Sequence, residues 1–191
     1  MRTLERLADL TLANGMQGKV SAGHCCSLAF MQDADALRII DKVAKAEINI
    51  FTLPACNLVL MGRSLKPAPR GLTRIKELLA HGVRVSAASD NVSDPFNSLG
   101  NYDLLHIANL TAHAAHMTGS EEIATCLRMV TEFPAQAFYG VAGGLVPGAD
   151  ADLVVIDSQR VADLVPTMPL RLATFKRGKQ IVKTEVKQIW N

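Results

Sequence analysis

The stretch VRVSAASDN, residues 83–91, joins a short strand pattern to a polar exit. Val83–Ala88 contains two valines and three small residues around Arg84, which is typical of a buried strand. Ser89, Asp90 and Asn91 follow at once. Parallel α/β proteins place their ligand sites at the carboxyl ends of strands, so Asp90 is the first candidate for chemistry. The alternative is that Asp90 forms an Asx turn at the strand exit.

Upstream of this stretch, helical and strand patterns alternate. Apolar residues at three- and four-residue spacing predict helices over 1–14, 34–46 and 71–80. An extended run and a β-branched, aromatic run predict strands over 19–24 and 48–53, with a Gly- and Pro-rich loop over 57–70. This order predicts parallel β/α units, and both a doubly wound sheet and a (β/α)8 barrel satisfy it.

Downstream of Asn91 the pattern changes. Helices are expected over 102–117 and 121–133, with Ser120 as N-cap of the second, and a short helix then runs to Tyr139. After Gly143 short strands are expected over 153–156, 171–175, 180–183 and 186–189. Arg177-Gly178 is a tight-turn signal between two of these strands.

The composition is typical of a globular protein, since 49% of the 191 residues are hydrophobic and 20% are charged. The net charge of +2 is spread along the chain, so neither nucleic acid nor an anionic membrane is an expected partner. No stretch reaches the roughly 20 apolar residues that cross a bilayer. The four cysteines lack C-x-x-C spacing and are expected to be reduced thiols in a cytoplasmic protein.

His24 ends the first predicted strand as Asp90 ends the third. A His and an Asp at one sheet edge fit a divalent metal site or a proton-transfer pair around a water. A buried histidine bonded to the backbone is the alternative for His24. Among the other histidines, His81 follows a helix, and the remaining three are expected on a polar helix face: His106, His113 and His116. The turn-rich segment 94–101 is expected to form a loop over the strand ends.

Four motifs in chain order resemble one known family. They are VSAGH (20–24), RGLTR (70–74), VRVSAASDNVSDPF (83–96) followed by Gly100-Asn101, and the ending GADADLVVID (148–157) with KRGKQIV (176–182). This set is similar to the amidohydrolase superfamily, in the branch of cytosine deaminase and N-isopropylammelide amidohydrolase. The ending is shared across the superfamily, whereas the segments around His24 and Asp90 point to the branch.

The resemblance implies an α/β fold that is the C-terminal part of a (β/α)8 TIM-like barrel, strands six to eight, plus C-terminal strands of a small β-sandwich. Residues 1–140 would then be the partial barrel and residues 141–191 the β segments of the composite small domain. By this mapping the chain begins inside the helix that precedes strand six.

The resemblance also implies roles for site residues. Asp90 would ligate a divalent metal, Zn or Fe, and take a proton from the attacking water, while His24 would orient water or substrate. Asn91 and Phe96 would line the substrate pocket. Cytosine deaminases tend to have Asp and Trp at the positions of Asn91 and Phe96, which favours the ammelide-type relatives.

The family's remaining metal ligands, including an H-x-H pair, have no counterpart in this sequence. The expected function is therefore the C-terminal portion of a metal-dependent hydrolytic deaminase of a small nitrogen heterocycle, inactive by itself. A complementing N-terminal half-barrel or a homo-oligomer is the expected partner, and a truncated reading frame is a third possibility. The rival hypothesis is a non-catalytic remnant that acts as an oligomerising or regulatory partner.

Overall fold

A three-stranded parallel sheet organises the first part of this computed structural model, which describes residues 3–140 and 144–190. Its strands are β1 (Ser21–Gly23), β2 (Asn49–Thr52) and β3 (Val85–Ala87), in the spatial order β1-β2-β3. Ala22 is in register with Ile50, and Ile50 with Val85. The predicted parallel arrangement is confirmed, and all three strands therefore end at the same edge.

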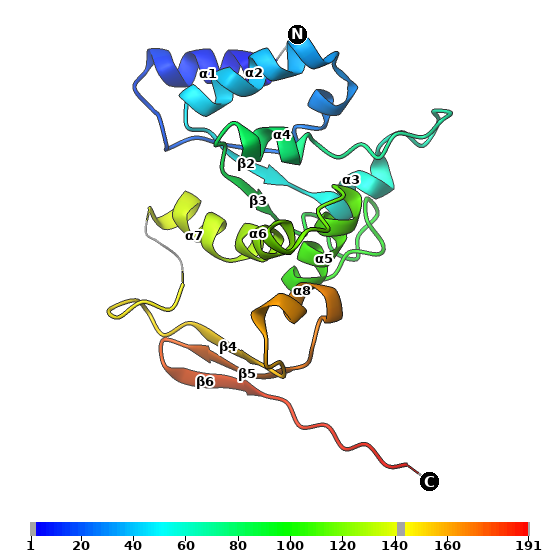
Figure 1. Ribbon diagram of the computed structural model, residues 1–191, viewed down its shortest axis with the longest axis vertical. Coiled ribbons are helices and arrows are strands. Elements are labelled where there is room, and N and C mark those ends of the chain that lie inside the picture. The colour runs from blue at the N-terminus through cyan, green and yellow to red at the C-terminus, as the bar shows by residue number, and fades with distance from the viewer. Residues whose placement is uncertain (1–2, 141–143, 191) are drawn as a thin grey trace.

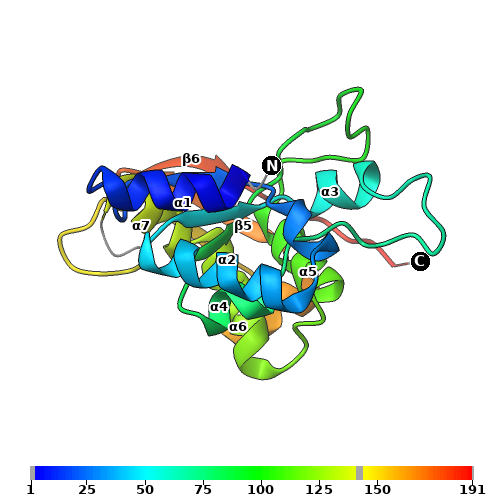
Figure 2. The ribbon, with the colours of Figure 1, turned by 90° about the horizontal axis from the view of Figure 1, so that it is seen from above.

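Helices α1 (Thr3–Ala13), α2 (Asp33–Lys45) and α4 (Ile75–Ala80) connect and flank these strands, as Figures 1 and 2 show. The apolar faces of α2 and α4 share one core with Ile50 and Val85, both fully buried. The β-branched pattern of β2 and the helical spacing of α2 thus predict the same core. The expected helix from residue 71 is wrong in its start, because α4 begins four residues later at Ile75.

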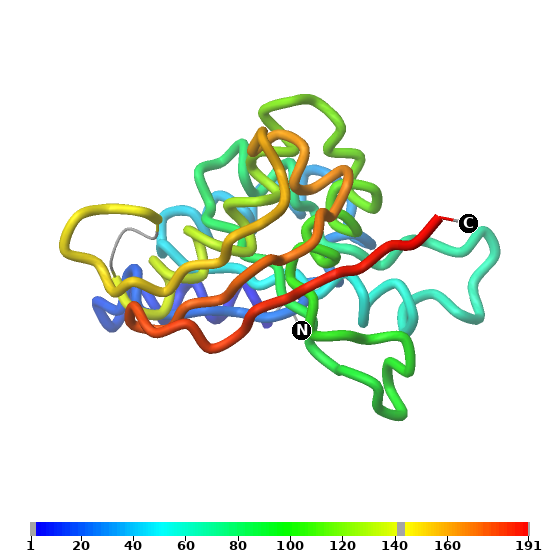
Figure 3. Tube along the Cα trace, turned by 90° about the horizontal axis from the view of Figure 1, so that it is seen from below, coloured from blue at the N-terminus to red at the C-terminus, as the bar shows by residue number. Residues whose placement is uncertain are grey.

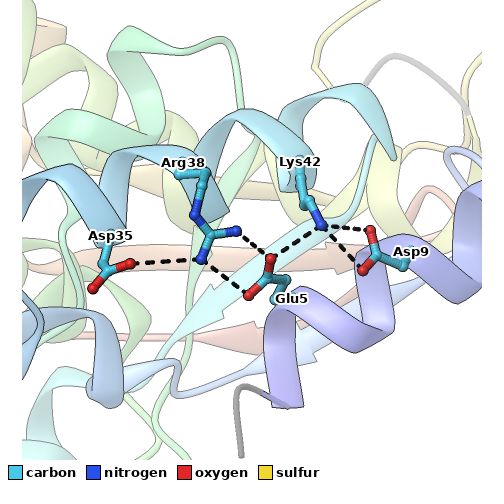
Figure 4. A network of polar contacts seen from close by, with 5 residues as sticks. All are labelled: Glu5, Asp9, Asp35, Arg38 and Lys42. Carbon is cyan, nitrogen blue, oxygen red and sulfur yellow. Dashed lines mark hydrogen bonds and ion pairs between the residues drawn. The ribbon is translucent and has the colours of Figure 1, made fainter.

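Polar contacts join α1 to α2 on the outer surface (Figure 4). The Lys42 ammonium lies 3.0 Å from Glu5 and 2.9 Å from Asp9, and the Arg38 guanidinium pairs with Glu5 and with Asp35. These bonds from Arg38 and Lys42 lower the pKa of Glu5 from its ordinary 4.5 to about 2. Ion pairs between basic side chains of α2 and acidic side chains of α1 therefore join the two helices.

The segment after β2 is not a simple loop. Helix α3 (Pro54–Leu60) begins two residues past the strand, whereas the sequence analysis expected a loop from Asn57. Pro54 stands at the first position of the helix, where its missing N–H costs no hydrogen bond. This correction matters for function, because α3 stands at the carboxyl edge of the sheet.

Helices α5 (Leu104–Ala114), α6 (Ser120–Val130) and α7 (Glu132–Tyr139) follow β3. The Asp103 carboxylate caps α5 by accepting hydrogen bonds from the amides of Leu105 and His106. Gly119, not the expected Ser120, is the N-cap of α6, and its N–H donates to Glu122. The expected helix to 117 is too long, so His116 lies beyond α5 with a φ of 54°.

An antiparallel sheet forms the C-terminal part, with the strands β4 (Leu153–Ile156), β5 (Arg171–Lys176) and β6 (Lys179–Lys183). Arg177 and Gly178 both have positive φ, at 49° and 76°, which confirms the predicted tight turn. Between β4 and β5 the chain forms a 3-10 turn, Val161–Asp163, and α8 (Leu164–Thr167). Figure 1 places this sheet at the opposite end of the molecule from α1 and α2.

The expected strand over 186–189 is wrong. Thr184 N–H still donates to Leu172, but residues 184–190 then continue without strand structure, as the extended tail in Figure 3 shows. The expected boundary at 140–141 touches residues 141–143, which lie outside the described residues. Across the described ranges, no helix has the length and apolar character to cross a membrane.

Candidate active site

The exits of β1 and β3 bring His24 and Asp90 together. His24 directly follows β1 and Asp90 comes three residues after β3, although the two are far apart in sequence. His24 Nε2 lies 3.5 Å from Asp90 Oδ2, with the two side chains 48% and 27% exposed. The pair is therefore close enough to share a proton or a water molecule and open enough for a small molecule to reach it.

Unusual backbone conformations place both side chains. His24 has a φ of 63° and Asp90 a φ of 59°, in the left-handed region that residues with a side chain rarely adopt. The N–H of His24 donates to the carbonyl of Phe51 at 2.9 Å, which anchors the residue to β2. Such strain costs on the order of 1–3 kcal/mol per residue and concentrates at functional sites. Both turns lie at this one edge of the sheet.

Asn57 is a third member of the site that the sequence analysis missed. It lies in α3, is 2% exposed, and places its amide Nδ2 2.8 Å from His24 Nδ1. Its side chain therefore touches the nitrogen of His24 that faces away from Asp90. The sequence signal for Asn57 was its position shortly after the second predicted strand, where Pro54 can begin a helix.

Cys56 stands beside Asn57 and approaches the exit of β3. Its thiol, 1% exposed, donates to Asn91 Oδ1 at 3.4 Å. Burial raises the pKa of Cys56 to about 11, and the neighbouring Asp90 carboxylate adds to the shift. Cys56 is thus a neutral hydrogen-bond donor near pH 7 and does not act as a thiolate nucleophile.

Both polar atoms of the Asn91 side chain are hydrogen-bonded. Oδ1 accepts from Cys56, and Nδ2 donates to the carboxylate of Asp94. Asp94 Oδ1 also accepts from the amides of Phe96 and Asn97, each at 2.9 Å. These donors, first Asn97 and then Asn91, lower the pKa of Asp94. Asn91 is consequently oriented by the protein itself, and its role toward substrate stays a prediction.

The loop that Asp94 organises is closely packed at its base. A Cβ on Gly100 would lie 2.2 Å from the carbonyl oxygen of Asn91, so only glycine allows the two segments to approach this closely. Phe96 is 60% exposed at the outer part of this loop. In Figure 2 the green loop projects from the same side of the molecule as α3. Its predicted substrate contact also stays a prediction.

A divalent metal needs more ligands than the described side chains at this edge supply. A catalytic metal takes about three protein ligands, drawn from carboxylate, imidazole and thiolate groups. Within residues 3–140 and 144–190, no group of three or more such side chains is placed to hold an ion. Asp90 would be one member of such a set, so the described residues do not complete a metal site.

The other histidines lie elsewhere. His81 Nδ1 is 2.7 Å from Asp41, His106 Nδ1 is 3.0 Å from the amide of Asn101, and His113 Nδ1 is 2.9 Å from the carbonyl of Asn109. Each of these three contacts lies on an exposed part of the surface.

A hollow lies at the other end of the strands. A cavity of about 500 Å³ is lined by residues at the amino ends of β2 and β3, including Asn49 and Arg84, and by Gln136 of α7. Arg84 donates to Asn49 Oδ1 at 2.6 Å inside it. His24, Asn57 and Asp90 do not line this cavity, so the candidate site is separate from it.

Known proteins resemble this chain over nearly its whole length. The model of the Amidohydrolase family matches residues 1–182. The chain is 37% identical to a pterin deaminase from Rhizobium rhizogenes, over 94% of this chain and 41% of that protein. It is 26% identical to the N-isopropylammelide isopropyl amidohydrolase of Pseudomonas sp. strain ADP, over 96% of this chain and 43% of that protein.

A solved structure gives the same result. The crystal structure of 5-methylcytosine deaminase from Klebsiella pneumoniae, liganded with 5-fluorocytosine, superposes with a TM-score of 0.93 at 31% identity. The match covers 100% of this chain and 46% of that one. The chain thus spans less than half the length of the relatives it matches. By its sequence and its α/β fold, this chain belongs to the amidohydrolase family, in the deaminase-like branch.

Proposed function

We propose that the chain is the C-terminal part of a metal-dependent hydrolytic deaminase, with β1, β2 and β3 as strands six to eight of a (β/α)8 barrel. Residues 1–140 would form the partial barrel and residues 141–191 would contribute to a small composite β domain. The consecutive parallel order of the three strands supports this assignment. So does the match to about half of a complete 5-methylcytosine deaminase.

The observation that carries the proposal is the approach of His24 to Asp90 at the strand exits. In this reading, Asp90 accepts a proton from the attacking water and contributes one ligand to a Zn or Fe ion. His24 directs a hydrogen bond toward the reacting oxygen or the substrate. The other ligands of such an ion must come from outside the described residues.

The substrate class is a small nitrogen heterocycle with an amino or alkylamino group that hydrolysis removes. The names of the relatives support this class, because pterin, 5-methylcytosine and N-isopropylammelide are all nitrogen heterocycles. Asn91 and Phe96 are the proposed substrate contacts, with Asn91 presented by Cys56 and Asp94.

The chain by itself is proposed to be inactive. Within the described part, β1 and β3 each pair with β2 alone, so each keeps one open edge that barrel closure would cover. A complementing N-terminal half-barrel is the proposed partner, and a homo-oligomer is the alternative. A cytoplasmic location belongs to the same proposal.

A second candidate is a non-catalytic remnant that keeps the scaffold and acts as an oligomerising or regulatory partner. A remnant would not need the three-residue ligand group that is absent from residues 3–140 and 144–190. Metal content separates the two candidates, because a remnant has no reason to acquire a stoichiometric ion in any assembly.

The test uses the chain alone and the chain co-expressed with the portion of the R. rhizogenes pterin deaminase that it does not match. Bound metal is measured by plasma mass spectrometry, and release of ammonia or amine from pterin, 5-methylcytosine and N-isopropylammelide is followed. Metal and turnover in the assembly, lost in Asp90→Asn, would support the deaminase. Turnover by the chain alone would refute its inactivity, and absence of metal from every stable assembly would favour the remnant.

A further inference from the structure

We infer that Asn57 is a positioning residue that fixes the tautomer of His24, so that Nε2 carries the ring proton and faces Asp90. The inference is based on the contact between Asn57 Nδ2 and His24 Nδ1, which lie 2.8 Å apart. Its meaning for catalysis rests on the proposed function, whereas the tautomer itself does not.

The direction of this hydrogen bond follows from the group that faces the other ring nitrogen, which is the carboxylate of Asp90. With Nδ2 toward the ring, one amide hydrogen is bonded and Oδ1 is the buried atom without a partner in the described residues. With the amide flipped, Oδ1 would face the ring, so the neutral imidazole would carry its proton on Nδ1. An unprotonated Nε2 would then face the Asp90 carboxylate, which only accepts hydrogen bonds. The observed orientation is therefore the favoured one.

The backbone holds both partners in place. Asn57 N–H donates to the carbonyl of Leu53, and its own carbonyl accepts from Met61, each at 2.9 Å. His24 is tied to the carbonyl of Phe51 at the same distance. The two side chains thus project from segments that are each anchored to β2 or its continuation, and their contact has little freedom to rearrange.

The tautomer determines what Nε2 can do. A neutral imidazole has one N–H donor and one acceptor nitrogen. If Nδ1 accepts from Asn57, the proton is on Nε2, which lies 3.5 Å from Asp90 Oδ2. His24 then offers a hydrogen bond to Asp90 or to an oxygen between them, and has no free Nε2 lone pair for a metal ion. A histidine at a strand end can bind a metal or donate a hydrogen bond, and the geometry assigns His24 the role of donor.

The test is nitrogen NMR of the full-length chain labelled with 15N-histidine, at about pH 8.5, where an ordinary imidazole is neutral. His24→Gln identifies the His24 resonances by their loss. In the wild type we expect an unprotonated Nδ1 and a protonated Nε2. Asn57→Asp offers only acceptor oxygens, so we expect the pattern to reverse. Asn57→Leu has neither group and is expected to give averaged signals from both tautomers.

A matched control comes from a second pair in the same chain. Asn101 Nδ2 contacts His106 Nδ1 at 3.0 Å, but this contact is exposed to water. Asn101→Asp should leave the His24 signals unchanged. Because Asp and Leu are both close in size to Asn, a purely structural role for Asn57 would not reverse the tautomer in one variant and average it in the other.

A protonated Nδ1 in the wild type, or His24 signals that are the same in all three Asn57 variants, would overturn the inference. If a variant or the chain alone does not stay folded, the same spectra are recorded in the co-expressed assembly with only this chain labelled. The spectra need neither metal nor turnover. An inactive assembly with the expected tautomer would therefore contradict the proposed function and leave this inference intact.

Discussion

The two sheets of the molecule differ in how they bury their residues. In the parallel sheet, Ile50 and Val85 are completely buried. In the antiparallel sheet, the adjacent residues Val154 and Val155 are 51% and 45% exposed. Neighbouring residues of a strand point to opposite faces, so both faces of the second sheet are accessible at this position. The first sheet has its own hydrophobic core, and the second lacks an equivalent one in the described structure.

Among the described residues of the C-terminal part, one side chain is buried, that of Val165 in α8. It is 2% exposed and belongs to the hydrophobic core of the first part. The carbonyl of Val165 accepts a hydrogen bond from Asn109 of α5 at 2.9 Å. The C-terminal part is thus attached through the segment between β4 and β5. The residues that stabilise the first sheet therefore differ from those that attach the C-terminal part to it. Substitutions in the two groups should have separate effects.

The largest effect is expected in the core of the parallel sheet. Ile50→Ala should lower the free energy of unfolding by about 2–5 kcal/mol, because it removes buried methylene groups and leaves a cavity. Ile181→Ala in β6, where the side chain is 58% exposed, should change it by less than about 0.5 kcal/mol. Urea unfolding of both variants measures the contrast. Equal losses would show that the second sheet is also packed in solution.

A smaller effect is expected where the two parts meet. Asp103 caps α5 and also pairs with Arg171 of β5, whose Nη1 lies 3.1 Å from Asp103 Oδ2. Although burial opposes it, hydrogen bonds from the amide of His106 and from Arg171 keep the pKa of Asp103 low. Asp103→Ala should cost about 1 kcal/mol through loss of the cap. Arg171→Ala should cost less than about 1 kcal/mol.

Asp103→Asn is the matched control, because it keeps an acceptor for the helix amides and removes the charge. Limited proteolysis should show earlier cleavage within residues 144–190 in Arg171→Ala than in the wild type. If Asp103→Asn is as unstable as Asp103→Ala, the ion pair with Arg171 and not the cap is the main contribution.

The third prediction concerns the loop at the edge of the first sheet. Asp94→Ala removes the acceptor of three hydrogen bonds, yet global stability should fall by only about 1 kcal/mol, because the loop lies outside the core. Hydrogen exchange of the amides of Phe96 and Asn97 should become much faster. Asp94→Asn retains Oδ1 and should be intermediate. Unchanged exchange in Asp94→Ala would mean that the sheet, and not Asp94, orders this loop.

The smallest effect is a pH dependence that differs between the two parts. The pKa of Glu5 is lowered from 4.5 to about 2 in the folded chain, so its stabilising contribution is present above 4.5 and is lost as the pH falls toward 2. Glu5→Gln should flatten the acid loss of stability in the first part. In the second part, the bond from Lys176 and then that from the Arg177 amide lower the pKa of Asp152.

Asp152→Asn should accordingly affect the acid response of the hairpin β5–β6 alone. Amide exchange followed between pH 6 and pH 2 reports the two parts separately. An identical acid response of both parts in both variants would contradict their independence.

Much of the fold followed from local patterns. The strand over Leu153–Ile156 has the predicted bounds, and the strands ending near His24 and Asp90 occur where β-branched and small residues predicted them. The misses have physical reasons. Helix α3 is short and packs against α5, so its signal is mostly tertiary. Residues 186–189 have strand propensity, but no neighbouring strand pairs with them in the described structure.

By itself, the sequence determined the alternation of helices and strands, and it placed His24 and Asp90 at strand exits, because both depend on residues that are adjacent in the chain. Only the tertiary structure decided that these two side chains lie 3.5 Å apart and that Asn57 contacts the far side of the imidazole. These contacts join separate β/α units through the register of β1, β2 and β3. Local periodicity does not contain that register, since it arises from packing between distant segments.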